Sequence, residues 1–272
     1  MSKYIKKYRP FIDAGIREAI TYKTNWIFMM IGNILGCFIS FFLWKSVFLS
    51  SEKPDFMGFS IEQMTIYIFV TFITNNMISS GGTYDIGEEI KDGSIAMRML
   101  KPISYNFTFL FQEIGNKLIN VVLVFIPLIL GVEIYRYVTT GVLRFSFINF
   151  TMYVISIMLA YLVNFFFNIC YGFTAFIFKN LWGSNMLKNC LVNFLSGVVI
   201  PLAFLPLAVR KIFLILPFAS LNYTPVMIYM GKYCGKEALC HMTLQFMWCI
   251  VFWIFSKIIW HMAVKYLCIQ GG

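Results

Sequence analysis

Residues 85–104, DIGEEIKDGSIAMRMLKPIS, form a charged stretch between two long hydrophobic runs. Its aliphatic residues recur at helical spacing, Gly93 interrupts it and Pro102 closes it. The chain has 272 residues, of which 60% are hydrophobic and only 12% charged. In such a chain a charged island predicts the place where a membrane protein meets something soluble.

The composition excludes a soluble globular protein, whose charged fraction is usually about 25%. We therefore expect one all-α membrane domain over residues 1–272. The net charge of +10 is carried by Lys and Arg residues scattered between apolar runs, without an aromatic and basic binding motif. This distribution favours anionic membrane lipids as partners and predicts no nucleic acid partner.

Six apolar runs have about the 20 residues that a helical membrane crossing needs. They lie near residues 26–44, 61–78, 114–132, 150–178, 189–207 and 242–259. An even number of crossings puts both termini on one side of the membrane. With the termini in the cytoplasm, fourteen Lys and Arg residues lie inside and eight outside. We therefore expect a multi-pass protein of the cytoplasmic (inner) membrane, with both termini and residues 85–104 in the cytoplasm.

Residues 1–24 have the pattern of an amphipathic helix. One side collects apolar residues from Tyr8 to Ala19, whereas Arg9, Asp13 and Arg17 lie on the other. This predicts an interfacial helix in the headgroup plane. A solvated tail before the first span is the alternative.

Residues 210–229 are apolar, but proline breaks them and they are too short to span. We expect external helices or a re-entrant hairpin that the protein shelters. An external gate and a packing cap are equally open roles here. The gate residues would be Pro201, Pro206, Pro217, Tyr223 and Pro225.

Two motifs resemble a known family. Glu89, Gly93-Ser94-Ile95 and Pro102 are similar to the segment after the second span in ABC exporter permeases of the second exporter type. SGVVIPLAFLP at 196–206 and LPFASLNYTPVMIYMGK at 216–232 resemble a branch of six-span permeases of unknown substrate. Together with the order of spans, the resemblance covers nearly the whole chain.

The resemblance implies that residues 85–104 form a cytoplasmic coupling helix between spans two and three, which docks on an ABC ATP-binding subunit. The aliphatic residues would supply buried contacts and the charged ones would set orientation and partner choice. The coupling residues would be Ile86, Glu88, Glu89, Ile90, Gly93, Ile95, Met97, Arg98, Leu100 and Pro102. The alternative is an ordinary solvated loop.

The chain carries no phosphate-binding loop of the form G-x-x-x-x-G-K-[ST]. We therefore expect ATP and magnesium on a separate subunit, present in two copies, and no cofactor on this chain. Six spans make half of a usual transport pathway, so a second permease copy or a paralogue is expected.

Glu113 and Lys117 lie four residues apart at the start of the third span and share a helix face. A mutual ion pair at the membrane interface is the preferred interpretation, and a substrate contact is the alternative. His241 and His261 are too far apart along one helix to share a metal, so no metal site is predicted. Whether Cys234 and Cys240 form a disulfide stays open.

The sequence thus predicts the permease subunit of an ATP-driven exporter of an amphipathic or hydrophobic substrate such as a drug, a peptide or a lipid. It predicts no catalytic residue. A membrane enzyme, suggested by the adjacent Glu88 and Glu89, is one alternative. A non-catalytic immunity or scaffold protein is the other.

Overall fold

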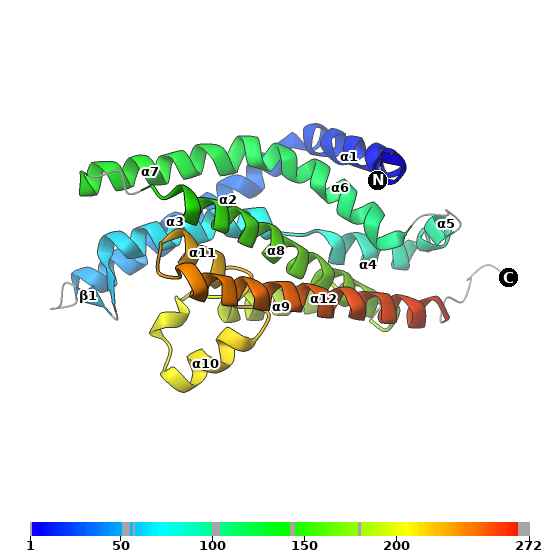
Figure 1. Cartoon of the computed structure of the whole chain (residues 1–272). Helices are drawn as coiled ribbons and strands as arrows, with labels where there is room; N and C mark the ends of the chain where they lie inside the picture. The colour runs from blue at the N-terminus through cyan, green and yellow to red at the C-terminus, as the bar shows by residue number, and fades with distance from the viewer. Residues whose placement is uncertain are drawn as a thin grey trace.

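Long helices run side by side along an elongated bundle in the computed structural model (Figure 1). It describes residues 2–50, 55–56, 58–99, 104–141, 145–178 and 181–265, with the backbone alone at 2–6, 55–56, 98–99 and 263–265. The helices are α1 Ser2–Thr21, α2 Lys23–Leu49, α3 Ile61–Ile78, α4 Gly82–Asp92, α5 Ile95–Met99, α6 Tyr105–Asn120, α7 Ile126–Thr140, α8 Phe147–Gly172, α9 Trp182–Leu195, α10 Leu207–Ile215, α11 Tyr223–Tyr229 and α12 Gly235–Lys265. A π-helical turn, η1, covers Val121–Phe125, and 3₁₀ turns η2 and η3 cover Phe173–Phe176 and Leu202–Phe204.

Four helical segments of the described chain are long and apolar enough to cross a membrane. They are Lys23–Leu49, Tyr105–Thr140, Phe147–Phe176 and Gly235–Met262. These segments contain the predicted spans 26–44, 114–132 and 242–259, and most of 150–178. The bounds of α3 coincide with the predicted span 61–78, but polar residues at both of its ends lower its hydropathy.

The segment from Tyr105 to Thr140 is one continuous helix made of α6, η1 and α7. Its 36 residues span about 54 Å, well beyond the ~30 Å hydrocarbon core of a bilayer. Pro127 has no N–H to donate to the preceding turn, and the π-helical turn comes just before it. Proline therefore widens this helix locally without ending it.

The two ends of the bundle hold different elements (Figure 1). One end holds α1, α4, α5 and the last turns of α12. The other holds the two-stranded antiparallel sheet of β1 (Asp55–Phe56) and β2 (Phe59–Ser60). The charged stretch, α1 and the C-terminal turns of α12 thus share one end.

Helix α8 runs through the core and packs against α12, α11, α4 and α3. A larger apolar cluster surrounds α3, α8 and α11, and a smaller one lies where α4, α5 and α6 meet α8. All seven residues of α11 are buried. This short helix therefore lies inside the bundle, where its neighbours shelter the non-helical backbone around it.

The predicted fifth span, 189–207, is not one continuous helix. Helix α9 begins at Trp182 and ends at Leu195 because Gly197, with a φ of +83°, forms a left-handed cap. The backbone N–H of Val198 donates to the carbonyl of Asn193 at 3.1 Å, which completes the cap. The apolar run of the sequence continues through this cap, so hydropathy did not predict the end of the helix. We call residues 196–201 the α9–η3 break.

Candidate functional site

The charged stretch forms two short helices, α4 and α5, at one end of the bundle (Figure 1). Gly93 ends α4 in the left-handed region, with a φ of +78°, where a side chain would be strained. The backbone N–H of Ser94 donates to Asp92 Oδ1 at 2.9 Å and closes the turn. Hydrogen bonds from Ser94 also lower the pKa of Asp92. The helix break predicted at Gly93 is therefore present in the backbone.

The aliphatic residues of this stretch face in two directions. Ile86 and Ile95 are 0% and 1% exposed and belong to the smaller apolar cluster, so they pack within the chain itself. Ile86 lies against Gly172 of α8, where an added Cβ would approach the Cβ of Ile86 to 3.1 Å. The prediction that Ile86 contacts a partner therefore differs from the structure: it fixes α4 on α8 instead.

The outward face of α4 and α5 carries the exposed residues Glu88, Lys91 and Met97. Met97 is 68% exposed although it is apolar, which leaves it available for a contact. Ile90 and Glu89 are half-buried, and Tyr105 Oη donates to Glu89 Oε2 at 3.0 Å.

Three predicted coupling residues remain without structural placement. The side chain of Arg98 and all of Leu100 and Pro102 lie outside the described residues. The face that can be assigned thus rests on Glu88, Lys91 and Met97.

Glu113 of α6 binds the start of α4. Residues 79–81, which we call the α3–α4 break, separate α3 from α4. Glu113 Oε1 accepts hydrogen bonds from Ser80 Oγ at 2.8 Å and from the backbone N–H groups of Gly81 and Gly82 at 3.0 and 3.1 Å. Tyr161 Oη donates to Glu113 Oε2 at 2.9 Å. A carboxylate here pairs otherwise open N–H groups at the positive end of the α4 dipole.

Lys117, one turn further along α6, binds the end of α3. Its Nζ donates to the backbone carbonyl of Asn76 at 3.0 Å and to Ser79 Oγ at 2.8 Å. A cation at the C-terminal end of a helix is favoured by the negative end of the helix dipole. Glu113 and Lys117 together form what we call the charged anchor, which holds both sides of the α3–α4 break.

The charged anchor differs from the mutual ion pair that the sequence suggested. Among the described side chains, Glu113 and Lys117 form no ion pair of 4 Å or less with each other. Each side chain carries a charge opposite in sign to the dipole at the helix end that it binds. The run Ser79-Ser80-Gly81-Gly82 is the sequence signal that could have indicated it, because such a run predicts a helix break with exposed N–H groups.

Asp85, in the first turn of α4, lies near several carboxylates. Its outer surface is exposed, yet neighbouring protein atoms displace water from the carboxylate, and Glu113 and Glu18 repel its charge. These effects, the loss of water being the largest, raise the pKa of Asp85 to about 7. Asp85 therefore changes its charge near neutral pH.

Helix α6 is itself held by α1 through two glycines. A Cβ at Gly15 would overlap the backbone carbonyl of Gln112, and a Cβ at Gly115 would overlap that of Ile12. The two backbones can approach this closely only because both positions lack a side chain. The ring of Tyr8 stacks on that of Phe111 at a centroid distance of 4.9 Å. The apolar face of α1 is thus covered by α6, and its charged face is left exposed.

Comparison with known proteins gives one family. A sequence model described as ABC-2 family transporter protein matches residues 34–271. The chain belongs to the ABC-2 transporter family. A search of curated proteins found no match.

Membership in the ABC-2 family, together with the apolar helices, confirms the prediction of an all-helical, multi-pass membrane protein. Family membership supports a transport subunit. ABC-2 proteins in general work with an ATP-binding subunit. The resemblance drawn from residues 89–102 and 196–232 therefore pointed to the right family.

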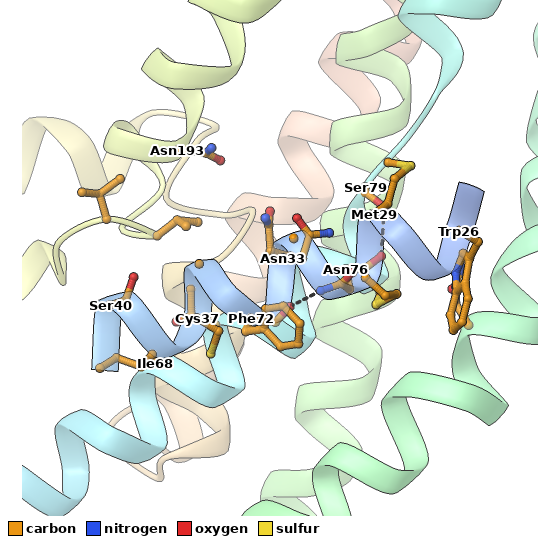
Figure 2. Close-up of a pocket in the computed structure, with 18 of the residues that line it drawn as sticks. Trp26, Met29, Asn33, Cys37, Ser40, Ile68, Phe72, Asn76, Ser79 and Asn193 are labelled. Atoms are coloured by element: carbon orange, nitrogen blue, oxygen red, sulfur yellow. Dashed lines mark hydrogen bonds between the residues drawn. The ribbon is translucent and has the colours of Figure 1, made fainter. Parts of the chain in front are cut away.

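A cavity of about 590 Å³ lies between α2, α3 and α6 of this ABC-2 family member. Figure 2 shows side chains of α2 and α3 along it, with Asn193 on another side. Polar residues of α6, including Glu113, Asn116 and Asn120, line one part. Trp26 Nε1 donates to Asn120 Oδ1 at 2.8 Å and ties α2 to this wall. We call this space the α2–α3 cavity; it was not predicted from the sequence.

Four of the five predicted gate residues are buried in the bundle. Pro201, Pro217, Tyr223 and Pro225 are buried, whereas Pro206 is exposed at the start of α10. Pro201 belongs to the α9–η3 break, where Tyr67 Oη donates to the carbonyl of Gly197 at 2.5 Å. The backbone N–H of Tyr223 donates to the carbonyl of Ser196 at 3.1 Å. Helix α11 is therefore sheltered inside the bundle, whereas α10 has no buried residue and protrudes from it (Figure 1). The role of the segment as a gate stays a prediction.

The cysteines and histidines considered from the sequence form neither a disulfide nor a metal site among the described residues. Cys234 and Cys240 are both free thiols. The ring of His241 stacks on that of Tyr233 at a centroid distance of 4.3 Å. Within the described residues, no three His, Cys, Asp or Glu side chains are grouped so that they could hold a metal.

Proposed function

We propose that the chain is the permease subunit of an ATP-driven exporter that moves an amphipathic or hydrophobic substrate across the cytoplasmic membrane. The chain would cross the membrane six times. The four long apolar segments would make four of the crossings, α3 would make another, and the segment from α9 to α11 would make the last. Both termini would be cytoplasmic. Two copies of an ABC ATP-binding subunit would carry ATP and magnesium, and a second permease copy or a paralogue would complete the pathway.

The charged anchor is the observation that carries this proposal. Helices α4 and α5 present Glu88, Lys91 and Met97 outward, while their inner face and first turn are bound to α8 and α6. A force on the outward face would therefore reach α6 and α8 through short, specific contacts. This is the arrangement that a coupling helix needs, because it must move with the spans.

Helix α1 supports the same mechanism. Its close glycine contact with α6 joins a helix with an exposed charged face to the helix that bears the charged anchor. We expect α1 to lie in the headgroup plane and to limit the movement of α6.

The proposal is tested by purifying the chain together with the proteins encoded beside it and measuring substrate-stimulated ATPase activity. The matched variants are Lys91→Glu on the outward face of α4 and Lys236→Glu in the first turn of α12, both at exposed lysines. Lys91→Glu should remove most of the stimulation, since it reverses charge where the partner would dock. Lys236→Glu should leave it unchanged.

Two results would overturn the proposal. One is that no ATPase co-purifies, which would favour a non-catalytic scaffold or immunity protein. The other is that Lys91→Glu and a second outward variant, Met97→Asp, both keep full stimulation.

A further inference from the structure

A second cavity, of about 220 Å³, lies between α3, α4, α8 and α9. Seven asparagines line it, together with serine and threonine hydroxyls and a single lysine, Lys188. No aspartate or glutamate is among the described residues that line it. We call this space the asparagine cavity.

Lys188 of α9 is only 9% exposed. Its Nζ donates to Asn168 Oδ1 at 2.5 Å and to Thr83 Oγ1 at 3.4 Å, and it lies 4.9 Å from the centre of the Tyr171 ring. These partners are neutral. A buried ammonium with neutral partners is unusual in a membrane protein, where charged residues commonly pair or mark a ligand pathway.

Two amide oxygens in the cavity have no partner. Asn185 and Asn222 are 1% and 2% exposed, both line the cavity, and the Oδ1 atom of each is buried without a hydrogen bond. Unpaired buried polar atoms are unfavourable and are expected to be paired in the working state. Amide oxygens accept from hydroxyl groups, so a hydroxylated ligand would pair them.

We propose that the asparagine cavity binds the phosphate-bearing, hydroxylated headgroup of an amphipathic substrate. Lysine is a point charge suited to phosphate, and one lysine matches one negative charge. The amides and hydroxyls around it suit hydroxyl groups, which both donate and accept. The volume is below the ~300 Å³ of the smallest drug-sized pockets, so it fits a headgroup better than a whole amphiphile.

The remainder of such a substrate has a place next to the headgroup. Asn75, Ser79 and Asn193 line both the asparagine cavity and the larger α2–α3 cavity, whose walls include the apolar residues Met30 and Trp44. The two spaces are therefore neighbours that share these three wall residues.

The asparagine cavity also touches the coupling segment. Thr83, in the first turn of α4, lines the cavity and donates to Asn168 Oδ1 at 2.8 Å. A bound headgroup would contact the helix that reports to the ATP-binding subunit. This part of the inference rests on the proposed permease function, whereas headgroup binding can be tested without it.

The test uses the purified full chain in phosphatidylcholine nanodiscs and measures binding by native mass spectrometry. The probes are dihexanoyl phosphatidylglycerol, glycerol phosphate and dihexanoyl phosphatidylcholine. We expect phosphatidylglycerol to bind and phosphatidylcholine to bind more weakly. Lys188→Met should lower the affinity for phosphatidylglycerol by at least about tenfold. Lys257→Met, at an exposed lysine outside the cavity, should change nothing. Binding of glycerol phosphate that also depends on Lys188 would identify a soluble source of the same headgroup chemistry.

Lys188 also joins α9 to α4 and α8, so its loss could unfold the chain. Asn185→Asp keeps the volume and places a carboxylate one helical turn from Lys188. It should also weaken phosphatidylglycerol binding while the chain stays folded. Equal binding of all three probes, or unchanged phosphatidylglycerol binding in both variants, would overturn the inference. Because no ATPase is present, that failure is separate from failure of the permease proposal.

Discussion

The α3–α4 break and the α9–η3 break both interrupt helices inside the bundle, but they are held in different ways. At the first, the side chains of Glu113 and Lys117 bind opposite helix ends. At the second, Tyr67 and the backbone of Tyr223 pair open carbonyls without any charge. The charged contacts join α6 to the end of α3 and the start of α4, and the neutral contacts join α3 and α11 to the end of α9. The comparison indicates that charged side chains hold the break that leads into α4, the helix that we propose as the coupling element, whereas neutral hydrogen bonds are enough to hold the turn after α9.

Removing Glu113 should have the largest effect. Glu113→Ala leaves two backbone N–H groups and two hydroxyls without their acceptor. We expect a loss of about 3 kcal/mol in the free energy of unfolding, measured by denaturation in detergent micelles. Glu62→Ala, at an exposed glutamate in the first turn of α3, should cost below about 1 kcal/mol. If the two variants lost the same unfolding free energy, Glu113 would stabilise the chain no more than an exposed glutamate does.

Separating α1 from α6 should have the next largest effect. Gly115→Ala places a methyl group on the carbonyl of Ile12, so the two helices must move apart. The expected loss of unfolding free energy is about 2 kcal/mol. Gly131→Ala, on the same continuous helix with open space around it, is the control and should not destabilise the chain. A stable Gly115→Ala variant would contradict the close contact between α1 and α6.

The neutral break should be less sensitive. Tyr67→Phe removes the hydroxyl that pairs the carbonyl of Gly197. We expect it to lower the free energy of unfolding by about 1 kcal/mol, in the same denaturation assay. Tyr84→Phe, at a tyrosine that is 44% exposed, serves as the control. If Tyr67→Phe were more damaging than Glu113→Ala, the ranking of the two breaks would be reversed.

The smallest effect concerns pH. Folding raises the pKa of Asp85 from 3.8 to about 7, so the folded chain retains this proton over a pH range in which the unfolded chain has lost it. Asp85 therefore contributes stability that is complete below about pH 4 and is lost as the pH rises to about 7. In Asp85→Asn, the melting temperature should change less between pH 5 and pH 8 than it does in the parent. At pH 8 the variant should melt at a higher temperature than the parent. Parallel profiles of parent and variant would reject the contribution of Asp85.

Hydropathy predicted the positions of most spans because an apolar run of the right length has few other structures available in a membrane. It missed the end of α9 because the cap depends on the conformation of Gly197 and not on hydropathy. Helical spacing likewise predicted an apolar face in α4, yet it could not tell that α8 covers Ile86.

The site was harder to predict than the spans. Glu113 and Lys117 were selected as a pair from their spacing, but their partners belong to residues about thirty to forty positions away. Which side chain reaches a helix end depends on how α6 lies against α3, and that is set by packing across the whole bundle. The seven asparagines of the second cavity are similarly dispersed along the sequence and meet only in the fold.

The most direct test of the charged anchor exchanges its two charges in the variant Glu113→Lys/Lys117→Glu, with each single variant as control. If each residue binds the helix end of opposite polarity, the exchange places a cation at the start of α4 and an anion at the end of α3. The exchanged chain should then be at least as unstable as either single variant, and it should lose stimulation of the ATP-binding subunit. Recovery of stability and stimulation in the exchanged chain would instead show that the two residues serve each other as an ion pair, and would contradict the account.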